Sequence, residues 1–224
     1  MQNPHCLVAP TLHKTVFVAL LAVFTTTQIT GCFPLIAGAM VGTSLAATDR
    51  RTLGTQLEDR QIQLKAENII ANSMQGENVN VTVFNRRVLL TGQTPTAELK
   101  NKAEQLAAAI ENVKQVVNAL EVTTASSLIS RSNDALLTSK VKATFVDAKD
   151  VFANAFKITS ERGTVYLMGR VTQREADRAA DLTSRIAGVS KVVKVLDVIS
   201  EAELKQLQKE PAKASTTTES DRIQ

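Results

Sequence analysis

Apolar positions along the chain follow two periodicities, and the same succession of them occurs twice. Within residues 57–124, apolar residues four apart predict a helix, and alternating apolar residues then predict two strands joined by a turn. A second helix and a final strand follow. Residues 131–200 repeat this order at offsets of 75 to 77 positions, which predicts a duplicated module of about 65–70 residues.

Matched positions indicate which side chains form the core of each module. The second strands contain VLLTGQ (88–93) and VYLMGR (165–170), and each is expected to end at its glycine, Gly92 or Gly169. The matched pairs of the first helices are Asp59 with Asp134, Ile62 with Leu137, Ala66 with Val141, and Ile70 with Phe145. The second helices are expected to bury Ala103, Leu106, Ala107 and Ile110, and in the repeat Ala176, Ala180, Thr183 and Ile186.

These elements predict an α+β fold made of two tandem αββαβ modules. In each module, a small three-stranded sheet is covered on one face by two helices. A module of this size buries a limited core, and the connector at 124–132 is short, so the two copies are expected to lean on each other. Residues 201–224 are expected to form a polar, disordered tail whose first part has a helix-compatible composition.

The N-terminal residues have the pattern of an export signal. The apolar run at 15–24 is too short to span a bilayer as a helix, and small residues then precede Cys32. The sequence at 29–32, ITGC, resembles the bacterial lipobox, so residues 1–31 are interpreted as a signal peptide and Cys32 as the lipidated mature N-terminus. Residues 32–56, rich in Gly, Ala and Thr, are then a flexible tether. An uncleaved single-pass anchor is the alternative interpretation.

Removal of residues 1–31 changes the chemistry available to the chain. Both histidines and Cys6 are lost, and Cys32 carries lipid, so the mature chain has no histidine and no free thiol. This excludes Cys/His nucleophilic sites, histidine acid–base chemistry and His/Cys metal sites. No Gly-rich phosphate loop is present either. We therefore expect no enzyme activity, no cofactor and no metal.

The duplicated αββαβ order, with a glycine after the second strand and Gly188–Val189 before the last one, resembles the BON domain. The match covers about 57–124 and 131–200. The segment DRRTLGTQLEDRQI (49–62), together with the lipobox and two modules, is similar to the dual-BON outer-membrane lipoproteins called DolP. This resemblance implies a lipid-anchored protein on the periplasmic side of the Gram-negative outer membrane. It also implies binding of anionic phospholipids and links to division-site and outer-membrane protein assembly proteins.

Charge distinguishes the two modules. Residues 57–124 carry 7 basic and 8 acidic groups, whereas residues 131–200 carry 12 and 8. A basic face beside an anionic bilayer gains about 1 kcal/mol per well-placed Lys or Arg. The second module is therefore the candidate for binding anionic lipid, although the excess charge could equally serve only solubility. The pI of about 9.1 does not indicate nucleic-acid binding, because the chain is exported and lacks interleaved aromatics.

The first helix of the second module supplies the candidate lipid-binding residues, Leu136, Lys140 and Lys142. Leu136 lies about 100° round the helix from the predicted buried stripe and should point to solvent. The corresponding residue of the first module is Gln61, so the fold does not require an apolar side chain there. Two other interpretations remain open: Leu136 packs between the modules, or it has no role. A protein adaptor for an envelope assembly is the alternative function.

Overall fold

The computed structural model describes residues 49–214, with side chains described up to residue 207. Cys32 and the predicted signal peptide lie outside these residues. The first module is built from α3 (Leu53–Ser73), β1 (Asn78–Phe84), β2 (Arg87–Thr94), α4 (Ala97–Ala108), β3 (Gln115–Asn118) and β4 (Glu121–Val122). The second is built from α5 (Leu128–Asp147), the 3-10 turn η1 (Ala153–Ala155), β5 (Phe156–Glu161), β6 (Thr164–Thr172), α6 (Gln173–Ser184) and β7 (Lys191–Ile199).

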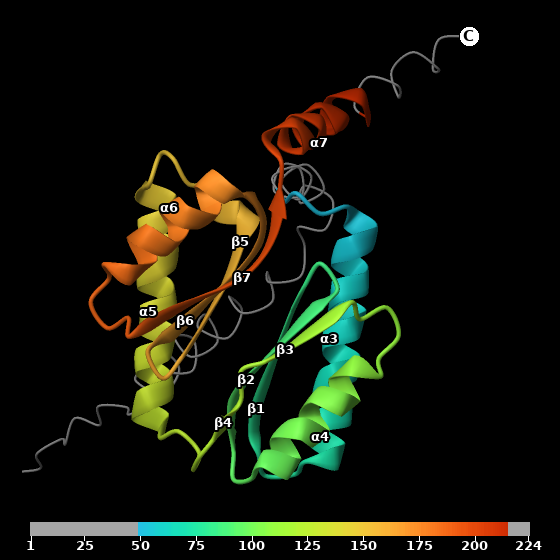
Figure 1. The fold of residues 1–224 in the computed structure, drawn as a ribbon, viewed down its shortest axis with the longest axis vertical. Helices are drawn as coiled ribbons and strands as arrows, with labels where there is room; N and C mark the ends of the chain where they lie inside the picture. The colour runs from blue at the N-terminus through green and yellow to red at the C-terminus, as the bar shows by residue number, and fades with distance from the viewer. Residues whose placement is uncertain (1–48, 215–224) are drawn as a thin grey trace, which may run out of the picture. The chain divides into compact units, whose positions relative to one another are not determined.

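Each module is one sheet with its two helices on one face, as predicted (Figure 1). β2 pairs antiparallel with β1 and parallel with β3 and β4. In the same way β6 pairs antiparallel with β5 and parallel with β7. β3 and β4 keep one register against β2, because Arg87 faces Gln115 and Gln93 faces Glu121. They are therefore a single last strand, interrupted where Leu120 is buried in the core.

The predicted helix stripes form the core of each module. All eight matched positions of the first helices are buried, including Asp59 and Asp134. The second helices differ slightly from prediction. Leu106, Ala180 and Ile186 are only partly buried, and Ala179 is fully buried in place of Ala180. The helix therefore turns the neighbouring alanine of its small-residue face toward the sheet.

The sequence predicted that each second strand ends at its glycine, and this prediction was wrong. β2 continues to Thr94 and β6 to Thr172. Both glycines instead allow a neighbouring backbone segment to approach closely, β1 at Gly92 and the end of η1 at Gly169. A Cβ on Gly92 would lie 1.9 Å from the backbone oxygen of Asn78, and one on Gly169 would lie 2.5 Å from that of Ala155. The glycine positions are thus set by close backbone contact.

Two described segments outside the predicted modules are structured. Residues 49–56, assigned to the flexible tether, are ordered because Arg50 and Arg51 form ion pairs and α3 already starts at Leu53. At the other end, residues 201–214 form helix α7 (Glu201–Ala214), whose Leu204 is buried. No helix within residues 49–214 is both long and apolar enough to cross a membrane.

The helix-free faces of the two sheets contribute to one shared cluster. Phe84 and Leu89 from the first module are buried together with Tyr166, Met168 and Val195 from the second. Polar contacts also join the two modules: Gln93 Nε2 donates to Glu161 Oε1 at 2.6 Å, and Lys157 Nζ donates to the Val83 carbonyl oxygen at 3.1 Å. The two copies do lean on each other, as the small size of each module predicts.

Candidate membrane-binding surface

The candidate residues lie on α5, whose sequence fixes both its start and its orientation. Ser127 caps the helix by accepting a hydrogen bond from the Ser130 backbone N–H at 3.2 Å. Leu137, Val141 and Phe145 bury one side of the helix in the module core. The opposite side faces solvent, and this outward face is the surface of interest.

α5 contains two acidic residues, and the side chain of one of them is buried. Asp134 is buried, and its carboxylate accepts hydrogen bonds from the backbone N–H groups of Arg162 and Gly163 at 2.8 and 2.9 Å. These residues form the turn of the β5–β6 hairpin. The other acid, Asp147, is the last residue of the helix. The surface of α5 from Leu128 to Val146 is therefore free of negative side chains.

Leu136 points to solvent, as predicted, and is 61% exposed. It is absent from the cluster shared by the modules, so packing between the modules does not explain its apolar character. Other apolar residues of α5 are also exposed: Leu128 (78%), Ile129 (76%) and Val146 (73%). Ile129 lies two turns before Leu136 on nearly the same line of the helix. The outward face is therefore an apolar stripe and not a single leucine.

Hydroxyl groups on the outward face are already satisfied within the helix. Ser132 Oγ donates to the Leu128 carbonyl oxygen, and Ser139 Oγ donates to that of Ala135, both at 3.0 Å. Thr144 Oγ1 donates to the Lys140 carbonyl oxygen at 2.9 Å. Such internal bonds reduce the cost of taking a hydroxyl out of water.

Exposed cations flank the apolar stripe on both sides. Lys140 follows Leu136 by one turn, whereas Lys142 lies on the other flank. Long cationic side chains in this arrangement can keep their charge in a polar layer while their stems cover apolar surface. Ile129 was missed by the sequence prediction, because residues 124–132 were read as a connector. The seven-residue spacing of Ile129 and Leu136 was the available signal.

The equivalent helix of the first module has a different surface. The residues of α3 that correspond to Leu136, Lys140 and Lys142 are Gln61, Lys65 and Glu67, and all three are exposed. Since the two helices hold the same place in a duplicated fold, this difference does not arise from folding. α3 also exposes leucines, Leu57 and Leu64, so the feature specific to α5 is an exposed apolar face with lysines and, as far as Val146, without an exposed acid such as Glu67.

Two arginines before α3 form a second feature that sequence reasoning did not assign. Arg50 forms a buried ion pair with Glu175 of α6, with Nη1–Oε2 at 2.7 Å and Nη2–Oε1 at 2.8 Å. Burial would raise the pKa of Glu175, but Arg50 and the Thr172 N–H outweigh burial and hold that pKa below its ordinary value. The pair thus bonds the start of the first module to the second module.

Arg51 is held within the first module. Its guanidinium lies 4.1 Å from the ring centre of Phe84, and Nη1 is 2.7 Å from Asp59 Oδ2. Burial would lower the pKa of Arg51, but Asp49 and Asp59 outweigh burial and raise it. Asp59 also accepts hydrogen bonds from the turn of the first hairpin, as Asp134 does in the second.

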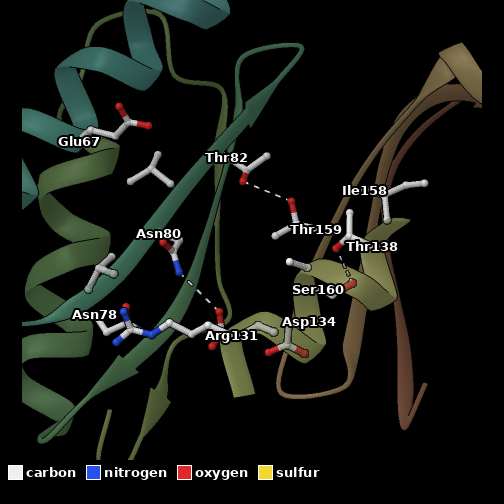
Figure 2. Close-up of a pocket in the computed structure, with 14 residues that line it drawn as sticks. Glu67, Asn78, Asn80, Thr82, Arg131, Asp134, Thr138, Ile158, Thr159 and Ser160 are labelled. Carbon is white, nitrogen blue, oxygen red and sulfur yellow. Dashed lines mark hydrogen bonds between the residues drawn. The ribbon is translucent and has the colours of Figure 1, made fainter. Parts of the chain in front are cut away.

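A polar groove lies between β1 and β5, with α3 and α5 beside it (Figure 2). Side chains bridge its floor: the hydroxyl oxygens of Thr82 and Thr159 are 3.4 Å apart, and Asn80 Nδ2 donates to Glu161 Oε2 at 3.5 Å. Its polar lining consists of hydroxyls, amides and carboxylates, with Arg131 at one side. These contacts join the two modules, so we regard the groove as part of their interface.

The fold and the α5 surface together define the class of protein. It is built from two copies of an αββαβ module, and the first helix of the second copy has a basic, apolar outward face. The BON domain family model matches residues 58–124 and 133–200. The chain belongs to the BON-domain family.

Two relatives extend this assignment. The chain is 41% identical to the outer membrane lipoprotein DolP of Haemophilus influenzae, over 74% of this chain and 87% of that protein. It is 31% identical to a 21 kDa hemolysin of Actinobacillus pleuropneumoniae, over 67% of this chain and 79% of that protein. The chain is thus a DolP-like BON protein, lipid-anchored at the outer membrane of a Gram-negative bacterium.

A solved structure of CdsD, a structural protein of the type III secretion system of Chlamydia trachomatis, also matches. The matched region covers 63% of this chain and 96% of the CdsD chain, at 14% sequence identity and with a TM-score of 0.27.

Proposed function

We propose that the chain binds anionic phospholipid through the outward face of α5 and thereby supports the integrity of the outer membrane. Cys32 is the proposed lipidated residue and holds the protein on the periplasmic face. α5 adds recognition of the headgroup charge. We assign no catalytic role to the chain.

The observation that carries this proposal is the composition of the α5 surface. Exposed apolar residues run along the helix, Lys140 and Lys142 flank them, and the acid Asp134 is buried against backbone N–H groups. A helix of this kind suits shallow insertion at an anionic bilayer, with apolar side chains in the headgroup–acyl boundary and cations at the phosphates.

The duplication provides a matched test of this proposal. The protein from residue 33 onward, without lipid, is titrated with anionic vesicles and with zwitterionic vesicles, and binding is followed by backbone amide shifts. We expect shifts on α5 with anionic vesicles only, and at least a tenfold loss of affinity in Leu136→Glu. Gln61→Glu makes the same charge change at the equivalent position of α3 and should bind like the unaltered protein.

The same variants separate lipid binding from a protein adaptor function. If Leu136→Glu binds vesicles normally but loses an outer-membrane assembly or division-site partner, the adaptor function replaces the proposal. If no vesicle binds the unaltered protein, α5 has no part in membrane contact.

Outer-membrane integrity is tested in cells. We expect a strain that carries only Leu136→Glu to become sensitive to detergent and to large antibiotics, whereas a Gln61→Glu strain stays resistant. Immunoblotting of the two strains should find equal protein levels.

A further inference from the structure

The chain enters its folded part at a fixed point. Arg50 and Arg51 are bonded to Glu175 and Asp59, so the segment before α3 is held against both modules. Only 16 residues, 33–48, separate this point from Cys32. Fully extended, they reach at most about 55 Å. Along the chain, this end is therefore the described part that lies nearest to the lipid anchor.

Exposed apolar side chains occur on both sides of this entry point, at the start of α3 and beside Arg50. Leu53 and Leu57 are 65% and 67% exposed and lie one turn apart on α3. Phe152 is also exposed, and its ring centre lies 5.4 Å from the Arg50 guanidinium carbon. We call these three residues the entry patch. The residue of α5 that corresponds to Leu57 is Ser132, so the fold does not require leucine at that position.

We propose that the entry patch is a second membrane contact, which seats directly on the bilayer that holds the lipid anchor. This inference rests on the anchor and is independent of lipid binding by α5. Arg50 and Arg51 are neutralised by Glu175, Asp49 and Asp59. This leaves Arg60, exposed one turn beyond Leu57, as a cation beside an otherwise apolar contact. The contact should therefore depend less on the headgroup charge than the α5 face does, which carries the exposed Lys140 and Lys142.

The bilayer fits this patch better than a second copy of the chain does. Three side chains fall far short of the roughly 800 Å² per partner that a stable protein interface buries. Shallow insertion of a few apolar side chains adds to an anchor that already holds the protein at the membrane.

The absence of tryptophan from the chain gives a direct test. Leu57→Trp is introduced into the lipid-anchored protein, which is reconstituted into zwitterionic vesicles with brominated acyl chains. Ile69→Trp is the control, because Ile69 is exposed on the same helix, more than three turns further along. We expect bromine to quench Leu57→Trp fluorescence at least twofold and to leave Ile69→Trp unchanged.

Three results would overturn the inference. Absence of quenching at position 57 shows that the patch stays in water. Equal quenching at positions 57 and 69 shows that the membrane contact is not confined to the entry patch. A blue shift without quenching, which grows with protein density, shows contact between copies.

A third reporter, Leu136→Trp, keeps the two membrane contacts distinct. In the same lipid-anchored protein, it should be quenched only when anionic lipid is added. Loss of this signal removes the α5 proposal and leaves the entry patch, and loss of quenching at 57 does the reverse.

Discussion

Single carboxylates determine much of the local geometry. Asp59 and Asp134 hold equivalent positions, and each accepts two backbone N–H groups from the hairpin turn of its own module. Turn residues with positive φ, such as Asn85, Arg86 and Arg162, place these N–H groups toward the carboxylate. The first helix and the hairpin are thereby joined in both modules, and Asp134 stays on the buried side of α5, away from its outward face.

At the same scale, the ion pair between Arg50 and Glu175 predicts acid sensitivity. A carboxylate whose folded-state pKa is lowered stabilises the fold above its unfolded-state pKa of about 4.3. This stabilisation disappears as the pH falls through the folded-state pKa. Below about pH 5, the free energy of unfolding in urea should therefore fall more steeply for the unaltered protein than for the double variant Arg50→Met/Glu175→Gln.

The single variant Arg50→Met provides the contrast. It leaves the Glu175 carboxylate buried without a cation and should cost about 3–5 kcal/mol of unfolding free energy at pH 7. The double variant should lose less, because no charge is left unpaired. Identical pH profiles for the unaltered protein and the double variant would show that the pair contributes nothing measurable.

At the scale of elements, α3 and α5 have the same buried stripe and different outward faces. Lys140→Glu and Lys142→Glu should each weaken binding to anionic vesicles about tenfold, because each replaces an attraction of about 1 kcal/mol with a repulsion. Added salt should shrink the difference. Vesicle sedimentation at two salt concentrations measures both effects.

Lys65→Glu is the matched control for that charge reversal. Lys65 is exposed and holds the position in α3 that Lys140 holds in α5. Its reversal changes the net charge of the protein by the same amount and should leave vesicle binding unaltered. A tenfold loss for Lys65→Glu as well would mean that overall charge, and not the α5 face, governs binding.

The duplicated pattern explains how much of this could be predicted from the sequence. Periodicity locates the helices, the strands and the buried stripes, and comparison of Gln61 with Leu136 identifies an apolar residue that the fold does not need. The contact of Arg50 with Glu175 joins residues 125 apart in the chain, and no local pattern encodes it. The start of α5 depends on the Ser127 cap inside a polar stretch, which conceals Ile129 as a surface residue.

At the scale of the whole described protein, the cluster shared by the two sheets predicts cooperative unfolding. Met168 is fully buried in this cluster beside side chains of the first module. Met168→Asp places a carboxylate there and should uncouple the modules, because a buried charge without a partner is costly. We expect one urea transition for the unaltered protein and two for Met168→Asp, observed by circular dichroism. One unchanged transition would show that the cluster does not couple them.

The bond between Arg50 and Glu175 also determines how mechanical load travels. Along the chain, the first module stands between the lipid anchor and the second module. In space, tension applied at the anchor passes through the Arg50 side chain straight into α6. Tension from the anchor can therefore reach the second module by a route that bypasses the fold of the first module. Thermal motion of the membrane can pull on the second module without first stretching the hydrogen bonds of the first sheet.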